Sequence, residues 1–467
     1  MKKQEEEKLA KLSPFEVKNK LIELAQNQHQ YSMINAGRGN PDWVAIKPRA
    51  AFFQLGIFAL EESKRTFSGY EGFGGIAQKD GISQRFEAFI AKNKNTEGVD
   101  YLKSYFDFAI SHYHMHKEEL LLEWVNGIIG DNYPVPDRML THSEIIVRAY
   151  LMQEMGAKNA QLKGSFDIFA VEGGTAAMVY IFNSLKANKF LNAGDTIAIG
   201  APIFTPYIEM PELKDYDLNL VEINSDENNG WQYPDSEIEK LKDPKIKAFF
   251  LVNPMNPPSV KLSEDSLNKI AAIAKERKDL ILLTDDVYGT FTENFTSLAM
   301  KAPEQTILVY SYSKYFGATG WRLGAIALHK DNMFDKFLAN LPQNEKAELY
   351  ERYKAMSMNP EGVKMIDRFV ADSRAVALNH TAGLSTPQQI QMVMFSKWMQ
   401  ENYNALDPVI RFAQEKGVIA MPGGGFDGPQ WTLRFSLANS SAETFSEVKK
   451  LGYEILEEYY QEFLASK

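Results

Sequence analysis

The chain has 467 residues, of which 45% are hydrophobic and 12% aromatic, enough to form a large core shared by about two or three domains. Its formal net charge of −10 argues against nucleic acid or an anionic membrane as the main partner, although a locally basic pocket would still accept anionic small substrates. It contains no cysteine, which excludes disulfides and thiolate metal sites.

Secretion, membrane insertion and metal binding are not expected from this sequence. The start of the chain, MKKQEEEKLAKL, is charged throughout and lacks the apolar core of a signal peptide. No run approaches the ~18 apolar residues that a membrane helix needs. The histidine cluster HYHMH at residues 112–116 does not converge on one helical face, and no carboxylate motif completes it. We therefore expect a soluble, cytoplasmic protein without a metal site.

The first part of the chain is predicted to be mostly helical. Residues 14–26 have helical hydrophobic spacing, and residues 50–130 are mainly helical in pattern, with no active-site chemistry that we assign. Between them, residues 36–43 (AGRGNPDW) form a tight loop rich in glycine and proline. Arg38 on this loop can present its guanidinium to a carboxylate or lie in solvent, and both interpretations are open.

A proline-containing loop follows, and the pattern then changes to alternating strands and helices. In residues 130–139 (GDNYPVPDRM), two prolines hold the chain extended and present Tyr133 either to a phosphate or to neighbouring side chains. The expected strands are residues 166–171, 195–200, 247–252, 280–284, 306–310 and 324–328. Such a pattern predicts an α/β fold with a mainly parallel sheet that helices cover on both faces. Ligands bind beyond the carboxyl ends of these strands, where the candidate residues lie.

The turn after the first expected strand has the composition of a phosphate site. In EGGT (172–175), Gly173 and Gly174 allow the N–H groups at the N-terminus of the helix that follows to approach a phosphate. Thr175 adds a hydroxyl group. An ordinary strand-to-helix turn can have the same sequence, so the prediction depends on what the other strand ends supply.

Later strand ends carry residues that suit an aromatic cofactor ring. Phe204, on a proline-bounded loop, can stack on such a ring. Asn256, between two prolines, can donate to a phenolic oxygen, and Tyr288 can join it there. Asp285 can pair with a pyridinium nitrogen and keep it protonated. Asp285 can also cap a helix and Tyr288 can fill a core, but the recurrence of such residues after successive strands favours a cofactor.

The segment at residues 311–324 (SYSKYFGATGWRLG) is the most specific pattern in the chain. Ser311 and Ser313 offer hydroxyl groups, and Arg322 offers a fixed cation between two glycines, which together suit a phosphate. Lys314 can form a Schiff base with an aldehyde. Pyridoxal 5'-phosphate (PLP) has an aldehyde and a phosphate at a matching separation, so we predict a PLP site. A surface loop with an ordinary lysine would explain neither the serines nor the arginine.

The last part of the chain returns to helical patterns and ends on a long amphipathic helix from about residue 441. Before it, residues 421–429 (MPGGGFDGP) form a glycine-rich loop that leads into a short strand containing Arg434. This arginine can bind a substrate carboxylate with two hydrogen bonds or lie on the surface of the strand. Its sequence context leaves both interpretations open.

Taken in order, these motifs resemble those of the fold-type I PLP-dependent aminotransferases. AGRGNP, GDNYPVPDRM, EGGTAAM, SKYFGATGWRLG and NHTAGLSTPQQ are similar in particular to the aspartate 4-decarboxylases, over nearly the whole chain. The resemblance implies a large PLP-binding domain at residues 51–345, with a helical segment at about 85–130. It also implies a smaller α+β domain built from both termini, at residues 1–50 and 346–467. Members of that family carry a longer segment where this chain has residues 394–407.

The resemblance assigns a role to each candidate residue. Lys314 is implied as the catalytic lysine that binds the cofactor and moves protons. The implied phosphate ligands are Gly174, Thr175, Ser311, Ser313 and Arg322, joined by Tyr133 from a neighbouring subunit. The implied ring contacts are Phe204, Asn256, Tyr288 and Asp285. The implied substrate residues are Arg434 for the α-carboxylate, Arg38 for the side-chain carboxylate and Lys18 near the entrance.

The implied activity is the PLP-dependent 4-decarboxylation of L-aspartate to L-alanine and carbon dioxide, with aspartate aminotransferase activity beside it. A plain aspartate or alanine aminotransferase is the alternative, since its PLP motifs are the same. A PLP-binding regulator would need a basic DNA-binding domain, and the 35 residues before AGRGNP are too few for one. The implied assembly is a homodimer at minimum, or a larger homo-oligomer, acting on amino-acid and keto-acid substrates.

Overall fold

The computed structural model describes most of the chain. The described residues are 14–26, 39–67, 72–131, 137–354, 357–377, 395, 398–422, 431, 433–435 and 442–466. The chain divides into two compact units, Met1–Val376 and Ala377–Lys467. The predicted domains at residues 51–345 and at the two termini stay a prediction. Within the described part of the chain, no helix is long and apolar enough to cross a membrane.

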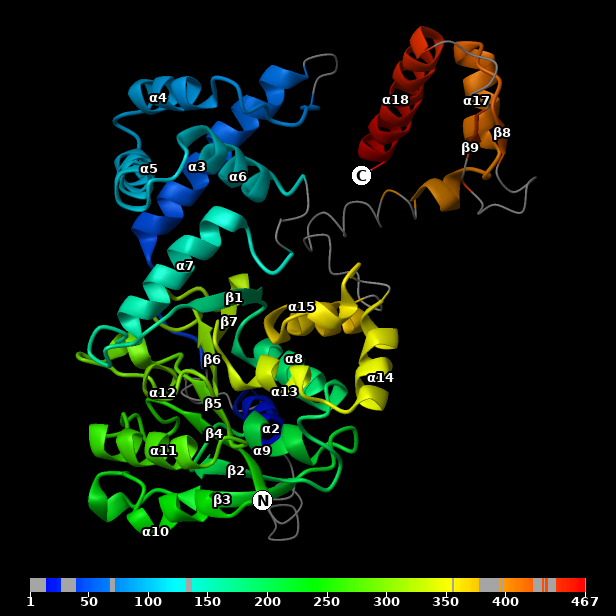
Figure 1. The fold of residues 1–467 in the computed structure, drawn as a ribbon. Helices are drawn as coiled ribbons and strands as arrows, with labels where there is room; N and C mark the ends of the chain where they lie inside the picture. Colours follow the sequence, from blue (N-terminus) through cyan, green and yellow to red (C-terminus); the bar gives the residue numbers. More distant parts are fainter. Residues whose placement is uncertain are drawn as a thin grey trace. The chain divides into compact units, whose positions relative to one another are not determined.

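A seven-stranded sheet with the order β1-β7-β6-β5-β4-β2-β3 forms the centre of the first unit (Figure 1). Its strands are β1 (Phe166–Val171), β2 (Thr196–Ala201), β3 (Asn219–Asn224), β4 (Ile246–Val252), β5 (Ile281–Asp285), β6 (Thr306–Ser311) and β7 (Gly324–His329). Strands β2 to β6 run parallel, and β7 is antiparallel to both β1 and β6. The prediction of an α/β fold with a mainly parallel sheet is confirmed.

Burial explains which strands the sequence predicted. Every residue of β6 and β7 is buried, as expected for strands covered on both faces. The expected strands agree with the observed ones to within one residue at each end. Strand β3 was not predicted, because it lies at the edge of the sheet and only Ile223 in it is buried. Its sequence, NLVEIN, therefore lacks a continuous apolar run.

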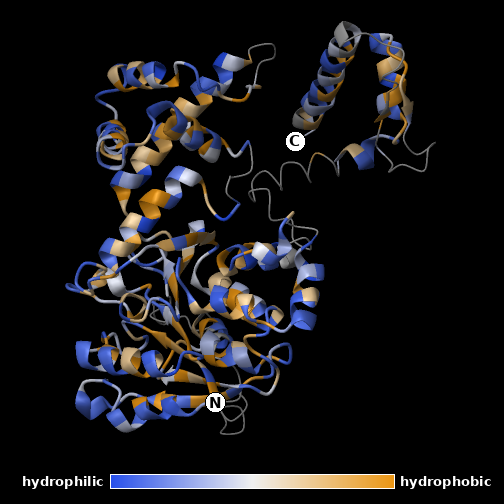
Figure 2. Cartoon of the chain, viewed as in Figure 1, coloured by the Kyte–Doolittle hydropathy of each residue, from blue (hydrophilic) through white to orange (hydrophobic). Residues whose placement is uncertain are grey.

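Alternate residues of the central strands face two separate apolar layers. On β4, Phe250 packs in one cluster with residues of α8 (Gly174–Ala187), whereas Phe249 and Leu251 pack in the other with residues of α11 (Glu264–Glu276). Figure 2 shows this hydrophobic character along the strands and the polar character of the outer helix faces. Ser263 caps the start of helix α11, since its side chain accepts a hydrogen bond from the backbone N–H of Ser266 at 3.1 Å.

Helices that precede the sheet form a third apolar cluster of their own. They are α3 (Ile46–Thr66), α4 (Ile82–Lys92), α5 (Val99–Tyr113) and α6 (Lys117–Ile129). Phe58, Phe86 and Leu121 are fully buried among them, and the Phe58 and Phe86 rings lie 5.2 Å apart in an edge-to-face arrangement. Helix α7 (Thr141–Glu154) follows and leads into β1. The prediction that residues 50–130 are mostly helical is confirmed.

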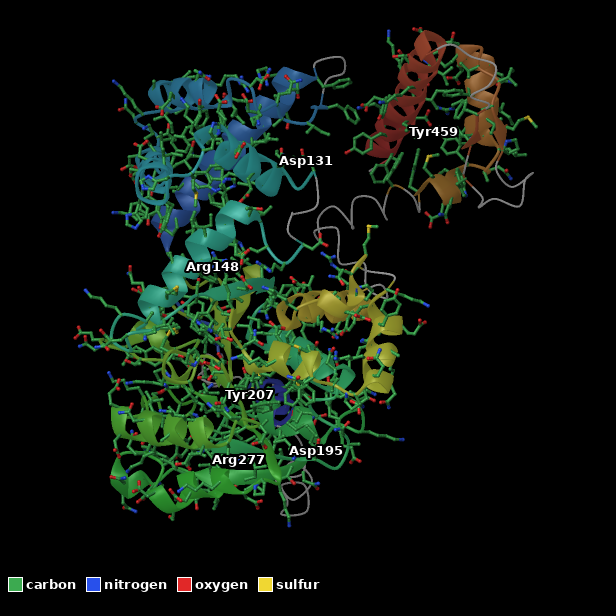
Figure 3. All side chains as sticks on the ribbon, viewed as in Figure 1. Asp131, Arg148, Asp195, Tyr207, Arg277 and Tyr459 are labelled. Atoms are coloured by element: carbon green, nitrogen blue, oxygen red, sulfur yellow. The ribbon has the colours of Figure 1, made fainter. Side chains whose placement is uncertain are left out.

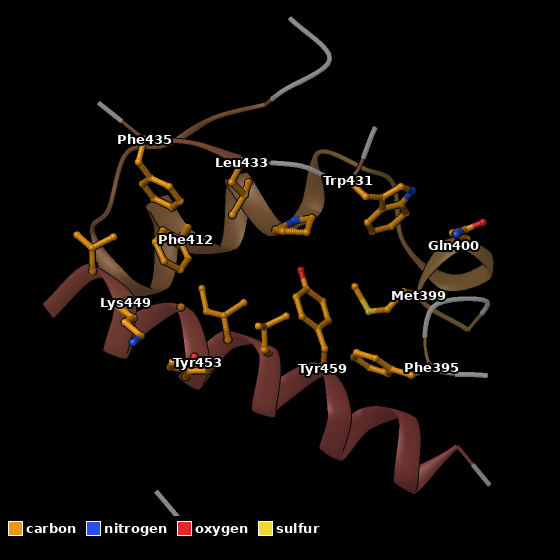
Figure 4. Close-up of a pocket in the computed structure, with 15 residues that line it drawn as sticks. Phe395, Met399, Gln400, Phe412, Trp431, Leu433, Phe435, Lys449, Tyr453 and Tyr459 are labelled. Atoms are coloured by element: carbon orange, nitrogen blue, oxygen red, sulfur yellow. The ribbon is translucent and has the colours of Figure 1, made fainter. Parts of the chain in front are cut away.

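The second unit has an apolar centre of its own. It contains α17 (Asp407–Lys416), the paired strands β8 (Met421–Pro422) and β9 (Leu433–Arg434), and α18 (Ala442–Ala465), the helix expected from about residue 441. A cavity of about 530 Å³ lies between α18 and the preceding elements (Figure 4). Phe412, Trp431 and Tyr459 contribute to its apolar lining. None of the predicted cofactor residues is among the described residues that line it.

A buried polar network ties the C-terminal half of α8 to α14 (Gln343–Tyr353) and α15 (Met365–Ala377). Its centre is Asp372, which is 3% exposed. The Asp372 carboxylate accepts hydrogen bonds from Ser184 Oγ at 2.5 Å, Tyr353 Oη at 3.0 Å and Arg352 Nη2 at 2.9 Å. Because each of these donors is satisfied by one carboxylate, the network fixes the end of α8 that is remote from the EGGT turn.

We predict that Asp372→Asn lowers the free energy of unfolding by about 3 kcal/mol, because it removes the charged acceptor of a buried network. The control is Glu348→Gln, which breaks an exposed ion pair. This pair joins Glu348 in α14 to Lys189, which lies just after α8. That change is expected to cost less than about 1 kcal/mol. Urea denaturation followed by circular dichroism measures both, and equal losses would contradict this account of the network.

Candidate active site

Those predicted cofactor residues that the structure describes gather at one edge of the sheet. Asp285 is the last residue of β5 and Ser311 the last residue of β6, and these two strands are parallel neighbours. The first residue of β7, Gly324, pairs with both Val171 at the end of β1 and Ser311. The EGGT turn and the lysine loop, which we define as residues 311–324 around Lys314, therefore meet. This is expected for a ligand site at the carboxyl ends of strands.

Arg322, which is part of the lysine loop, connects this loop to the EGGT turn. Its Nη2 donates to the backbone oxygen of Glu172 at 2.8 Å, and its Nη1 donates to that of Thr319 at 2.9 Å. A Cβ atom on Gly173, whose φ is 92°, would lie 2.7 Å from Arg322 Nη2. The positive φ therefore favours glycine there, and a side chain would displace the Arg322 guanidinium. The guanidinium lies beside the start of α8, where Gly174 and the following residues have N–H groups without intrahelical partners.

The predicted hydroxyl donors lie on the same segment and at the same helix end. Ser311 and Ser313 are buried, and their Oγ atoms lie 2.9 Å apart. The backbone N–H of Ser313 also donates to Ser311 Oγ at 3.3 Å, which fixes the pair. Thr175 is in the first turn of α8. Together with Arg322, these groups provide a cation, hydroxyls and helix N–H groups, which is the donor set that a phosphate needs.

Asp285 is only 6% exposed, and both of its carboxylate oxygens accept hydrogen bonds. The backbone N–H of Val287 donates to Oδ1 at 3.1 Å, and the Tyr207 hydroxyl donates to Oδ2. Burial raises the pKa of Asp285, while these two hydrogen bonds and the positive charge of Lys314 oppose the rise. The charge of this buried carboxyl group therefore depends on its immediate partners.

Lys314 lies half-buried on the loop after β6. Its Nζ donates a hydrogen bond to the backbone oxygen of Gly39 at 2.8 Å. Burial and the nearby Arg322 cation lower the pKa of Lys314, whereas the negative charge of Asp285 acts in the opposite direction. A lowered pKa increases the fraction of neutral amine, which is the form that attacks an aldehyde or accepts a proton.

The residues predicted for an aromatic ring also lie together in pairs. Asn256 Nδ2 donates to the Tyr288 hydroxyl at 3.4 Å, joining the loop after β4 to the turn after β5. The Phe204 ring stands at 89° to the Tyr207 ring, with centroids 5.7 Å apart. Tyr207 in turn bonds Asp285. Tyr207 was not predicted, although it ends the same proline-bounded stretch, residues 201–207 (APIFTPY), from which only Phe204 was chosen.

Residues 39–49 hold the lysine loop in place, and sequence reasoning missed them. Trp43 Nε1 donates to the backbone oxygen of Tyr315 at 3.1 Å. Arg49 Nη2 donates to the backbone oxygen of Gly317 at 2.7 Å. This segment begins within the AGRGNP motif, in which Arg38 was the predicted functional residue. Its contacts with the lysine loop became evident only from the positions of the loop's backbone oxygens.

Four predicted residues are not placed by their side chains. Tyr133 and Arg38 lie outside the described residues. Lys18 is in α2 (Pro14–Gln26) and Arg434 is in β9, but their side chains also fall outside what is described. The helix expected at residues 14–26 is confirmed, whereas the roles of these four residues stay predictions.

Comparison with known proteins identifies the family. The model of "Aminotransferase class I and II" matches residues 151–450. The chain is 46% identical over 521 aligned positions to the "Bifunctional aspartate aminotransferase and L-aspartate beta-decarboxylase" of Pseudomonas sp., and the alignment covers 98% of each protein. The chain belongs to the class I and II aminotransferases. Enzymes of these classes depend on PLP, so the predicted fold-type I architecture and the prediction of a PLP-dependent enzyme are confirmed.

Other aminotransferases match a smaller part of the chain. The aspartate aminotransferase of Sulfurisphaera tokodaii is 31% identical over 29% of this chain and 35% of that protein. Among solved structures, the aromatic aminotransferase from Pyrococcus horikoshii aligns with 77% of this chain and 92% of that one, at 20% identity and a TM-score of 0.38. The alignment with the bifunctional relative has 521 positions against the 467 residues here, so that protein has additional residues without counterparts in this chain.

The carboxyl group next to Asp285 provides a test of the electrostatics at this end of β5. Asp286 is completely buried, and its Oδ1 accepts a hydrogen bond from Thr284 Oγ1 at 2.5 Å. Burial raises the pKa of Asp286 to about 7, and the negative charge of Asp285 adds to the rise. In the unfolded chain an aspartate titrates near pH 4, at about 3.9. The protonated form therefore stabilises the fold fully below about pH 4, and this stabilisation is lost as the pH rises through about 7.

We predict that Asp286→Asn, which cannot titrate, makes the free energy of unfolding fall less between pH 5 and pH 8 than in the unsubstituted chain, on a scale of about 1.4 kcal/mol per pKa unit. Chemical denaturation at the two pH values measures the difference. The exposed Asp215 supplies the control, since Asp215→Asn should leave the slope unchanged. An identical slope in the Asp286 variant would show that this carboxyl group is not held protonated.

Proposed function

We propose that this chain is a PLP-dependent L-aspartate 4-decarboxylase that forms L-alanine and carbon dioxide, with aspartate aminotransferase activity as a side reaction. The observation that carries the choice of reaction is the 46% identity, over 98% of both proteins, to the bifunctional aspartate aminotransferase and L-aspartate beta-decarboxylase. The choice of cofactor is supported independently by the groups that converge at the carboxyl ends of β1, β5 and β6.

The donor set of the site suits each functional group of PLP. We assign the phosphate to Arg322, Ser311, Ser313, Gly174 and Thr175. Asp285 would pair with the ring nitrogen, and Phe204 would stack on the ring. Asn256 and Tyr288, already within 3.4 Å of each other, would share the ring oxygen. Lys314 would bind the aldehyde carbon, and its backbone position between the serines and Arg322 supports that assignment.

Bound PLP supplies an aldehyde for the substrate amine and a protonated ring that takes up the electrons released at the substrate carbon. Lys314 Nζ removes the α proton of L-aspartate and returns a proton to the product carbon. Its lowered pKa supports the first of these steps, because a neutral amine is needed to accept a proton. Asp285 keeps the proton on the ring nitrogen by remaining ionised beside it.

The two substrate carboxylates require different treatment. We assign the α-carboxylate to Arg434, which can hold it with two hydrogen bonds throughout the reaction. Arg38 would lie near the side-chain carboxylate and Lys18 near the entrance. A tight ion pair on the departing carboxylate stabilises the ground state and opposes the loss of carbon dioxide. A decarboxylase should therefore hold this group more loosely than an aminotransferase does.

We further propose that the enzyme works in the cytoplasm as a homodimer or a larger homo-oligomer. The net charge of −10 is compatible with that location, and the exposed aromatic residues Phe52, Phe53 and Trp321 beside the lysine loop support a subunit contact there. Tyr133 would then reach the phosphate of the neighbouring subunit.

The proposed reaction is tested by proton NMR of the PLP-loaded protein with L-aspartate and no added keto acid. We predict many turnovers of L-alanine formation with release of carbon dioxide. Lys314→Ala should reduce the rate more than about 100-fold, because it removes the group that moves the proton. The control is Lys330→Ala, which alters an exposed lysine just after β7 at the opposite end of the sheet.

Two results would contradict the proposal in different ways. Stoichiometric conversion to oxaloacetate, which stalls until 2-oxoglutarate is added, would make the protein a plain aspartate aminotransferase. An absence of any change in either condition would exclude L-aspartate as the substrate.

A further inference from the structure

Tyr207 contacts two of the residues proposed to face the PLP ring, although no role has been assigned to it. It lies in the first turn of α9 (Pro206–Glu212), as Figure 3 shows, and its side chain is buried, with 3% of its surface exposed. Its hydroxyl donates to Asp285 Oδ2, and its ring meets the Phe204 ring edge to face. Among the described residues, this is the one hydrogen bond that the Tyr207 hydroxyl makes.

We propose that Tyr207 is a positioning residue that orients the Asp285 carboxylate and keeps it ionised opposite the ring nitrogen of PLP. This inference rests on the proposed PLP site. It assigns Tyr207 no direct contact with substrate, because its hydroxyl is already used by Asp285.

The geometry around Asp285 supports this role. The backbone N–H of Val287 fixes Oδ1, so the donor at Oδ2 decides how the carboxylate is rotated. A Cβ atom placed on Gly174 would lie 3.6 Å from Asp285 Oδ2 and 3.9 Å from Tyr207 Oη, which places this hydrogen bond against the start of α8. An ionised carboxylate has about four acceptor positions, so two of them stay available for a ring N–H after these bonds are made.

The groups around Asp285 shift its pKa in opposite directions, and a neutral hydrogen-bond donor there supports the ionised form. Lys314 on the lysine loop favours the ionised carboxylate, whereas burial opposes it. On the same turn, an ionised Asp286 would repel Asp285, and Tyr288 presents a phenol. Burial and the negative charge of Asp285 raise the pKa of Tyr207 well above its usual value. Tyr207 therefore stays protonated and donates its hydrogen bond throughout the neutral pH range.

The sign of the expected effect follows from the hydrogen bond. Because the Tyr207 bond lowers the pKa of Asp285, its removal in Tyr207→Phe raises that pKa. PLP binding requires the ionised carboxylate, so affinity is lost as the pH falls through the pKa of Asp285. In Tyr207→Phe, this loss should begin at a higher pH than in the unsubstituted chain.

The test is equilibrium binding of PLP to the cofactor-free full-length chain, measured by absorbance between pH 5.5 and pH 9. We expect Tyr207→Phe to weaken binding about tenfold near neutral pH, with the acid-side loss moved to higher pH. Tyr216→Phe is the matched control, since Tyr216 is buried in the same apolar cluster and its hydroxyl bonds Asn183 Oδ1 at 2.6 Å, away from Asp285. The second probe is a PLP analogue with C–H in place of the ring nitrogen.

The inference predicts that the analogue binds Tyr207→Phe and the unsubstituted chain equally well. An equal penalty for PLP and the analogue, or for both tyrosine variants, would overturn it and reduce Tyr207 to a packing residue. Failure of the unsubstituted chain to bind PLP would overturn the proposed function as well. If binding behaves as expected and L-aspartate yields no alanine, the assigned reaction fails and the role of Tyr207 stands.

Discussion

The close approach of two backbone segments at Gly173 and Gly324 is the constraint on which the site depends. A Cβ atom on Gly324 would lie 2.8 Å from the Cα of Gly173, so a side chain at position 324 would force the two backbone segments apart. Strand β7 lies between β1 and β6, and its first residue pairs with the last residue of each. This arrangement lets Arg322 reach Glu172 and brings the start of α8 to the lysine loop.

The site then combines a small number of charges in a partly buried space. Burial lowers the pKa of Lys314, the negative charge of Asp285 opposes this, and the positive charge of Arg322 adds to the lowering. Burial alone would favour a neutral Asp285, but hydrogen bonds from Val287 and Tyr207 support its charge. The proposed chemistry needs a neutral amine and an ionised carboxylate together. Burial favours the neutral amine of Lys314. The hydrogen bonds from Tyr207 and Val287 support the ionised form of Asp285 against burial.

Sequence reasoning found the parts of this site that repeat a local pattern. Each buried strand was visible as an apolar run, and the residues after each run were therefore candidates. Strand β3 was missed because its edge position leaves most of its residues partly exposed. Tyr207 was missed because a tyrosine on an apolar helix turn looks like core packing until its hydroxyl is seen beside Asp285. The contacts of Trp43 and Arg49 with the lysine loop involve backbone oxygens, which no side-chain pattern reveals.

Every proposed role at this site depends on Lys314 being the residue that holds PLP. The most direct measurement is borohydride reduction of the PLP-loaded protein, which fixes the cofactor to the amine that binds it, followed by proteolysis and peptide mass spectrometry. The account predicts a single modified lysine, at position 314, in the peptide that contains Ser313 and Tyr315. A cofactor label on another lysine, with residue 314 unmodified, would contradict it and would remove the β6 loop from the centre of the site.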